Sequence, residues 1–302
     1  MATAQLTPAR VGIQHVLIAT DFSRYSDSAL HFGLQLAKAY GASSYIVYVV
    51  PSEPYLLAGP EVYVSARDAA RRDLEQLQSE LLRTHCLREG DDYHLYLLEG
   101  EIGEAILNFA RDKRIDLIVM GTHGRGGLGK ALLGSVAENV FRHSPVPVLT
   151  LGPGVCRSDW KGQPREILVP ADFTPASRRA VQYALEMADE HQAHVTLLHV
   201  VAPRELQHVP DHAAVQRGIE MRLAELANSG TGSVSCATRI EVGKVTETIL
   251  QVASEMAADL LVVGVRPSSG VLDRLVIPHA YDIVRDSPCP VLTLRETRAT
   301  PH

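Results

Sequence analysis

The sequence has no long apolar stretch. No run in its 302 residues approaches the roughly 18 apolar residues that a membrane-spanning helix needs. Residues 1–10 carry no apolar segment of the kind found in secretory signals. Cysteine is scarce, and the wide spacing of the four cysteines disfavours a zinc site or a disulfide framework: Cys86, Cys156, Cys236 and Cys289.

The chain also has no excess of positive charge. It contains 29 Lys and Arg against 35 Asp and Glu, which gives a formal net charge of −6. Binding to the phosphates of nucleic acid requires a clustered positive excess. We therefore expect a cytoplasmic protein with no membrane and no nucleic acid among its main partners.

The sequence contains an internal duplication. Residues 100–151 align with residues 243–294 without a gap, and 20 of these 52 positions are identical. The length of the chain is also about twice that of a typical domain of ~150 residues. Residues 152–164 are rich in Gly, Pro and polar residues, so the boundary should lie there. We expect two copies of one module, at 1–152 and 153–302.

Each copy alternates apolar strand-like runs with helical patterns. Residues 117–120 and 260–263 are apolar on both faces, as a parallel strand covered by helices must be. The alternation predicts two tandem α/β domains, each a doubly wound, five-stranded parallel sheet with helices on both faces. The fifth strand of each copy carries two prolines, which places it at a sheet edge. In the first copy we expect strands near 15–20, 44–50, 93–98, 116–121 and 146–151, and helices near 25–40, 64–86, 102–109 and 135–143.

Two segments of the first copy could bind a ligand. Asp21 directly follows the first predicted strand, and a Gly-rich loop, residues 121–130, follows the fourth. Ligands of open α/β sheets bind at such strand ends. Residues 124–129 match G-x-G-x-x-G, but a dinucleotide fold places this motif after the first strand. Residues 124–130 match most of a P-loop, but Ala131 offers no hydroxyl for Mg²⁺.

A third pattern on this loop is more specific. Gly121-x2-Gly124-x9-Gly134-Ser135 has all four fixed positions of G-x2-G-x9-G-[S/T], and a Pro-Val-Pro-Val segment follows at 145–148. With these motifs the chain resembles a tandem member of the universal stress protein family, in its ATP-binding subclass. The resemblance covers residues 15–151 and 166–294. It implies Rossmann-like domains of the adenine nucleotide alpha hydrolase type and a nucleotide-dependent role in stress response.

The resemblance also implies a binding site for ATP, with Mg²⁺, in the first domain only. Asp21 would accept from ribose or adenine, the backbone near residues 19 and 49 would line the base, and the loop with the next helix would hold the phosphates. Glycines and a helix start expose N–H groups that suit phosphate. It implies no catalytic residue and no protein ligand to a metal. The predicted site comprises Ala19, Thr20, Asp21, Val49, Met120, Gly121, Thr122, His123, Gly124, Arg125, Gly127, Gly134, Ser135 and Val136.

The second copy departs from the pattern. The alignment places Pro267, Ile277 and Pro278 where the first copy has Gly124, Gly134 and Ser135. Proline has no N–H to offer a phosphate, so we expect no tight ATP binding there. Asp172 corresponds to Asp21, so a nucleoside-shaped cleft could remain. We expect the second copy to act as a built-in dimer partner, with strands 146–151 and 289–294 pairing, and two chains could pair again as a homodimer.

Several alternatives stay open. Asp21 could be the N-cap of the first helix, Ser135 could form a capping box with Glu138, and His123 could only orient its loop. The protein could be a slow ATP-hydrolysing enzyme, although Glu101 and Glu104 are better explained as acids at a helix start. It could also be a chaperone-like stress factor that ignores nucleotide.

Overall fold

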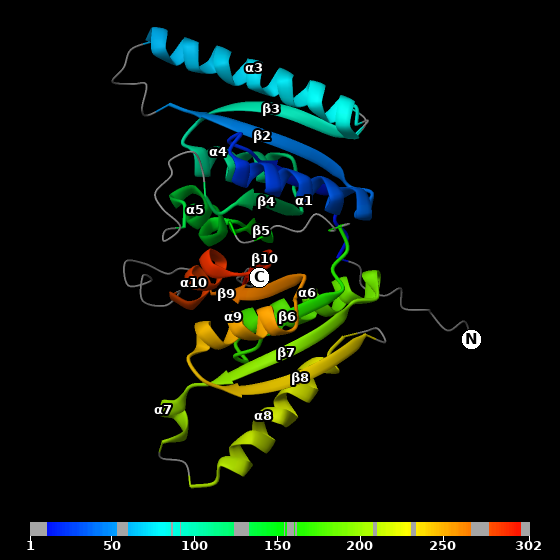
Figure 1. Ribbon diagram of the computed structural model, residues 1–302, viewed down its shortest axis with the longest axis vertical. Helices are drawn as coiled ribbons and strands as arrows, with labels where there is room; N and C mark the ends of the chain where they lie inside the picture. Colours follow the sequence, from blue (N-terminus) through cyan, green and yellow to red (C-terminus); the bar gives the residue numbers. More distant parts are fainter. Residues whose placement is uncertain are drawn as a thin grey trace, which may run out of the picture. The chain divides into compact units, whose positions relative to one another are not determined.

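The structure is a computed structural model of the 302-residue chain (Figure 1). It describes residues 11–52, 60–85, 87–90, 92–123, 133–153, 155, 160, 162–207, 210–230, 234–266 and 278–296. The chain divides into two compact units. We call residues 13–163, with which 284–286 group, the N-terminal module, and residues 164–283 with 287–296 and 11–12 the C-terminal module. The division lies within the expected boundary segment 152–164.

The N-terminal module alternates strands and helices. Its elements are β1 (His15–Ala19), α1 (Arg24–Tyr40), β2 (Ser43–Pro51), α3 (Pro60–His85), β3 (Tyr93–Gly100), α4 (Ile102–Asp112), β4 (Leu117–Gly121), α5 (Ser135–His143) and β5 (Val148–Leu151). The C-terminal module repeats the order, with one short extra helix. Its elements are β6 (Glu166–Pro170), α6 (Pro175–His191), β7 (His194–Val201), α7 (Pro203–Leu206), α8 (His212–Ala227), β8 (Ser235–Val242), α9 (Val245–Glu255), β9 (Leu260–Val265), α10 (Pro278–Asp286) and β10 (Val291–Arg295).

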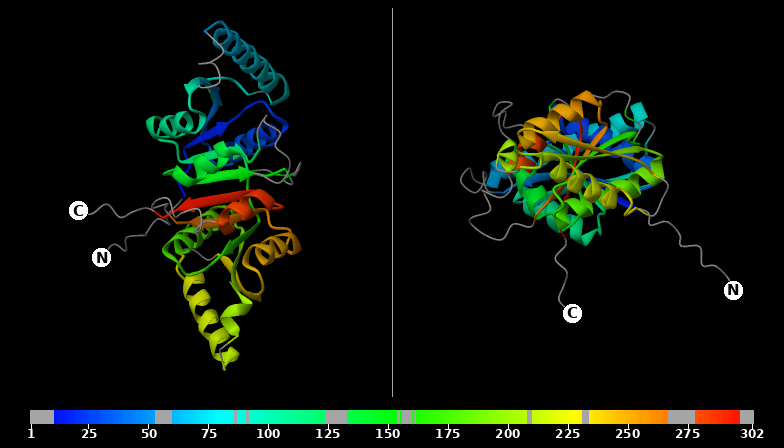
Figure 2. Two further views of the ribbon diagram at one scale, coloured as in Figure 1. Left: turned by 90° about the vertical axis from the view of Figure 1, so that its left-hand side faces the viewer. Right: turned by 90° about the horizontal axis from the view of Figure 1, so that it is seen from below.

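Both modules have the same sheet. The strand order is β3-β2-β1-β4-β5 in the first and β8-β7-β6-β9-β10 in the second, and the paired strands within each module run parallel. Because right-handed crossovers run in both directions from the first strand, helices cover both faces, as the side view in Figure 2 shows for α1 and α4. The predicted fold class is confirmed. No helix in the described part of the chain is long and apolar enough to cross a membrane.

The central strands form the core of each module. Val16, Leu17 and Ile18 of β1 have no exposed surface, and Ile167, Leu168 and Val169 of β6 match them. Burial on both faces of the sheet explains why these strands are apolar without alternation. The core thus fixes the strands whose carboxyl ends carry the predicted site.

The last strand of each module is shorter than we expected. β5 begins at Val148 and β10 at Val291, each directly after a proline, rather than at residues 146 and 289. The carbonyls of Pro147 and Pro290 accept from Ile118 N (3.1 Å) and Leu261 N (3.0 Å) of the neighbouring strand. Proline has no N–H to complete the ladder, so the strand starts one residue later. Each strand is the last in the order of its own module, as the prolines predicted.

The segment between the repeats packs on the N-terminal module. The ring of Trp160 stacks on Phe32 of α1 with centroids 4.9 Å apart, and both side chains are buried. Gly162 has a φ of +78°, and a Cβ there would collide with the carbonyl of Gln35. The boundary segment is therefore more than a spacer, because part of it covers α1.

Candidate functional site

The predicted site lies where the strand order reverses. β1 is flanked by β2 on one side and β4 on the other, and the crossovers from β1 and from β4 leave in opposite directions. In open α/β sheets this switch point is where ligands bind. Asp21 follows β1, and Gly121, Thr122 and His123 end or follow β4, so the two predicted segments flank one point.

Asp21 shapes the turn that leads into α1. Its Oδ1 accepts from Ser23 N at 3.0 Å, and Phe22 between them has a φ of +57°. Ser23 is the N-cap of α1 and accepts from Ser26 N. The alternative that Asp21 caps this helix is therefore wrong. The turn instead holds the carboxyl group of Asp21 beside the end of β1.

The predicted site residues at the ends of β1, β2 and β4 are mostly buried. Thr20 N donates to Val47 O at 2.9 Å, and its hydroxyl contacts Ser26 Oγ at 3.2 Å and accepts from Phe22 N at 3.1 Å. Val49 and Met120 are only 6% and 5% exposed, and Ala19 is half-buried. The hydroxyl of Thr20 is thus occupied by contacts within the protein. A ligand here would be recognised by the shape of the site and by contacts to backbone atoms.

The turn after β4 is built from backbone and hydroxyl contacts. Thr122 donates twice to Leu151 O, from N at 2.9 Å and from Oγ1 at 3.2 Å. Because its hydroxyl hydrogen goes to Leu151, the Thr122 oxygen is left to accept from Nδ1 of His123, 2.9 Å away. The predicted site residues Gly124, Arg125 and Gly127 lie outside the described residues.

His123 lies against the start of α1. Its ring packs on that of Tyr25, with centroids 5.3 Å apart. Within the described part of the chain its Nε2 is buried with no hydrogen-bond partner, and burial lowers the pKa of His123 below its ordinary value. His123 is therefore held neutral as part of the turn. Tyr25 was missed at the sequence level; its aromatic side chain two residues after the N-cap was the available signal.

The start of α5 faces the same turn. Gly134 N donates to Thr122 O at 2.8 Å, and a Cβ on Gly134 would lie 3.1 Å from that oxygen. Gly134 is the N-cap, no side chain caps the helix, and Ser135 is the first helical residue, so the alternative of a capping box on Ser135 is wrong. Glu138 instead pairs with Arg142 at 2.9 Å. The N–H groups of Ser135 and Val136 have no acceptor within the helix, because helix starts leave their first donors open.

The C-terminal module repeats half of this arrangement. Asp172 Oδ1 accepts from Thr174 N at 3.0 Å, and Phe173 has a φ of +64°, as in the turn at Asp21. The helix start differs, because α10 begins at Pro278, which has no N–H. Pro267 and Ile277 lie outside the described residues.

No metal cage is visible in the described ranges, where no group of three or more His, Cys, Asp or Glu side chains could hold a metal ion. Glu101 is the N-cap of α4 and accepts from Gly103 N at 3.1 Å and Glu104 N at 2.6 Å. Its place at the helix start, expected from the sequence, is confirmed.

Comparisons with known proteins agree with this architecture. The universal stress protein MJ0531 of Methanocaldococcus jannaschii is 36% identical over 138 residues, which span 45% of this chain and 80% of that protein. A universal stress protein of Thermus aquaticus is 33% identical over 134 residues, 44% of this chain and 95% of that protein.

The fold is also found among solved structures. A universal stress protein from Archaeoglobus fulgidus superposes with a TM-score of 0.72 at 21% identity, covering 95% of this chain and 97% of that one. The model of the universal stress protein family matches residues 12–151 and again residues 164–295, with one match for each module. The chain therefore belongs to the universal stress protein family, as a tandem member with two such domains.

Proposed function

We propose that the N-terminal module binds ATP at the carboxyl ends of β1 and β4, and that its occupancy acts as a switch in a stress response. The observation that carries the proposal is the contact of Gly134 N with Thr122 O at 2.8 Å. This contact holds the start of α5 against the turn after β4, so the open N–H groups of Ser135 and Val136 lie beside that turn. Such an array suits phosphate oxygens.

The remaining roles follow the direction of the strands. Asp21 would accept from ribose or adenine, and the backbone at Ala19 and Val49 would line the base. The phosphates would lie on residues 121–125 and 134–136. Because the described residues offer no carboxylate cluster, Mg²⁺ would be carried by the phosphates of the nucleotide rather than by protein ligands.

The helix start provides a test that removes one donor. Pro278 shows that a proline is accepted at the first helical position of this fold. Ser135→Pro should therefore keep α5 and remove one N–H from the phosphate site. A hydrogen bond to a charged group contributes about 1.5–3 kcal/mol, so we expect ATP affinity to fall by about 10- to 150-fold.

Ser135→Ala is the matched control, because it removes the hydroxyl and keeps the N–H. Isothermal titration calorimetry on the full chain should give a much smaller loss for this variant. If Ser135→Pro binds ATP as tightly as the unchanged protein, the assignment of the phosphates to α5 fails.

We propose a regulatory role rather than catalysis. Glu101, the acid that could have positioned water, is engaged by two backbone N–H groups of α4. Slow ATP hydrolysis and a nucleotide-independent chaperone-like role are the alternatives. The proposal also includes cytoplasmic residence, pairing of residues 146–151 with 289–294, and a further homodimer of the chain.

A further inference from the structure

The first residue of α1 brings a positive charge to the proposed ATP site. Arg24 is the single Lys or Arg in the described segments around this site, residues 19–27, 119–123 and 133–138. Burial lowers the pKa of His123, so that ring adds no charge near neutral pH. In the part of the chain that the structure describes, the guanidinium of Arg24 contacts Tyr25 and pairs with no carboxylate. Its charge is therefore available to a ligand.

The side chain of Arg24 folds back over its neighbour. Its Nη2 donates to the hydroxyl oxygen of Tyr25 at 2.7 Å, and its Cζ lies 4.7 Å from the centre of the Tyr25 ring. Successive side chains of a helix point about 100° apart and do not face each other. The contact therefore requires the guanidinium to turn toward the side of α1 on which Tyr25 lies, where the ring and the hydroxyl hold it.

Tyr25 in turn lies against the turn after β4. Its ring packs on that of His123 with centroids 5.3 Å apart, and its carbonyl oxygen would lie 3.1 Å from a Cβ on Gly121. Nδ1 of His123 is 2.9 Å from Oγ1 of Thr122. These contacts lead from Thr122, which is 1% exposed, to Arg24, which is exposed. Arg24 thus lies at the solvent end of the contacts that build this turn.

A nucleotide bound here would be ordered in the same direction. Its base would lie on the buried strand ends at Val49 and Met120, and its phosphates would follow toward the helix start at Ser135. The outer phosphates of a triphosphate lie farthest from the base and carry most of its charge. A guanidinium suits them, because its N–H groups can donate in pairs to phosphate oxygens.

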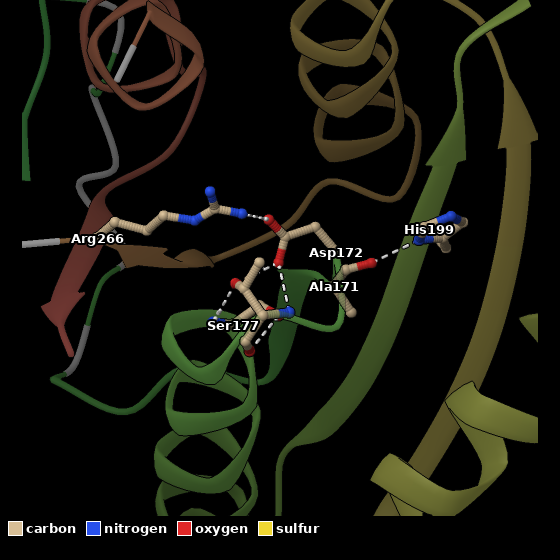
Figure 3. Close-up of polar contacts among 6 residues, drawn as sticks. Ala171, Asp172, Ser177, His199 and Arg266 are labelled. Atoms are coloured by element: carbon tan, nitrogen blue, oxygen red, sulfur yellow. Dashed lines mark hydrogen bonds and ion pairs between the residues drawn. The ribbon is translucent and has the colours of Figure 1, made fainter. Parts of the chain in front are cut away.

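The C-terminal module has no such arginine at its helix start. Pro175 and Ala176 occupy the positions of the Arg-Tyr pair, and Arg266 stands at the alignment position of His123. Nη2 of Arg266 lies 3.8 Å from Oδ2 of Asp172 (Figure 3), so that arginine faces a carboxylate of its own module. The repeat that keeps the glycine pattern is thus also the one whose first helix begins with an arginine that no carboxylate pairs.

We propose that Arg24 is a specificity-determining residue of the N-terminal site, where it holds the outer phosphates and so selects a nucleoside triphosphate over a monophosphate. The place of the phosphates in this assignment rests on the proposed function. Tyr25 is the positioning residue, because its hydroxyl oxygen and its ring orient the guanidinium. One N–H of Arg24 stays on Tyr25, and the others donate to the phosphate oxygens.

Calorimetric titration of the full chain with ATP and with AMP tests this assignment. Arg24→Ala should weaken ATP binding by about tenfold or more, because charge-assisted hydrogen bonds are lost, and should leave AMP binding nearly unchanged. Arg24→Lys should restore part of the ATP affinity. Tyr25→Phe keeps the ring and removes the hydroxyl, so its loss should be smaller than that of Arg24→Ala. Lys38→Ala is the control, since it removes one exposed positive charge from the last turn of the same helix.

Inorganic triphosphate, titrated as a probe without a nucleoside, separates this assignment from the proposed function. The assignment is overturned if Arg24→Ala weakens ATP binding no more than Lys38→Ala does, or if AMP binding falls as much as ATP binding. ATP binding that still depends on Ser135 would then leave the proposed function standing. If inorganic triphosphate binds through Arg24 but ATP does not bind, the proposed function fails and the role of Arg24 stands. If neither binds, both are overturned.

Discussion

Gly121 and Gly264 occupy the same position in the two repeats, and both are there for steric reasons. A Cβ on Gly121 would lie 3.1 Å from the carbonyl oxygen of Tyr25, and on Gly264 it would come within 2.2 Å of that of Ala176. The first turn of α1 presses against the end of β4, and the first turn of α6 presses against the end of β9. The glycine that survives in the second repeat is therefore explained by packing. Gly134, which aligns with Ile277, has the same close approach of 3.1 Å to a backbone oxygen and also begins the helix of the proposed phosphate site.

We predict that Gly264→Ala destabilises the protein more than Gly121→Ala. Backbone cannot give way as a flexible side chain does, so the overpacking should cost about 1–3 kcal/mol at Gly264 and less at Gly121. Urea unfolding followed by circular dichroism measures the difference.

Gly218→Ala serves as the control for this pair. Gly218 lies in α8, and a Cβ there meets nothing within 4 Å. Alanine should stabilise this helix by about 0.5–1 kcal/mol. Equal urea midpoints for Gly264→Ala and Gly218→Ala would show that the close approach at Gly264 does not affect the free energy of unfolding.

Glu101, the N-cap residue of α4, allows a test of whether this acid is structural or catalytic. Glu101→Ala removes the acceptor of two backbone N–H groups, so the free energy of unfolding should fall by about 0.5–2 kcal/mol. Release of phosphate from ATP should stay unchanged. Glu104→Ala, also in the first turn, is the control and should cost less. A loss of phosphate release without a loss of stability would favour the ATP-hydrolysing alternative.

Helix ends were predictable where local chemistry marks them. α5 runs from Ser135 to His143 as predicted, because Gly134 precedes it and Pro145 follows shortly after. α3 begins at Pro60 rather than near residue 64. Its apolar stripe marks only the face that packs on the sheet, while the first turn is signalled by a proline, which is favoured at a helix start.

Contacts between residues far apart in the chain could not be predicted from the sequence. The alignment shows that Arg266 replaces His123, but not that its side chain reaches Asp172. That contact depends on the separation of two strand ends and on the reach of a long side chain. The packing of Trp160 on Phe32 was likewise hidden, since the linker has no periodicity from which a buried face could be read.

The two modules share one fold but differ in the residues at the switch point. Their strand orders are the same, and the turns at Asp21 and Asp172 are built alike. What differs is the switch point: a helix start with open N–H groups lies there in one module, and Arg266 lies beside Asp172 in the other. A duplicated domain can thus change the residues at its switch point without changing its core.

The stability of the whole chain should fall in mild acid. Burial lowers the pKa of His123 and of His191, the latter against an opposing effect of Glu190, below the ordinary 6.5. The folded state thus keeps these rings neutral while the unfolded chain takes up protons near pH 6.5. Their contribution is fully present above that pH and is lost as the pH falls toward the folded pKa values. Burial, Glu80 and Asp21 raise the pKa of Asp27 above its ordinary 3.8. The folded state therefore takes up this proton before the unfolded chain does, which opposes the loss of stability, but only at a pH nearer 3.8.

Melting temperatures measured between pH 7.5 and 5.5 test this origin. The unchanged protein should lose stability across the interval, and His123→Gln should lose less, because glutamine does not titrate and fits a similar space. His143→Gln is the matched control for the substitution itself, since His143 is exposed on α5 and lies outside the turn after β4. An identical slope for His123→Gln and the unchanged protein would mean that the ring beside Thr122 titrates alike in both states, and that the turn after β4 does not hold it neutral.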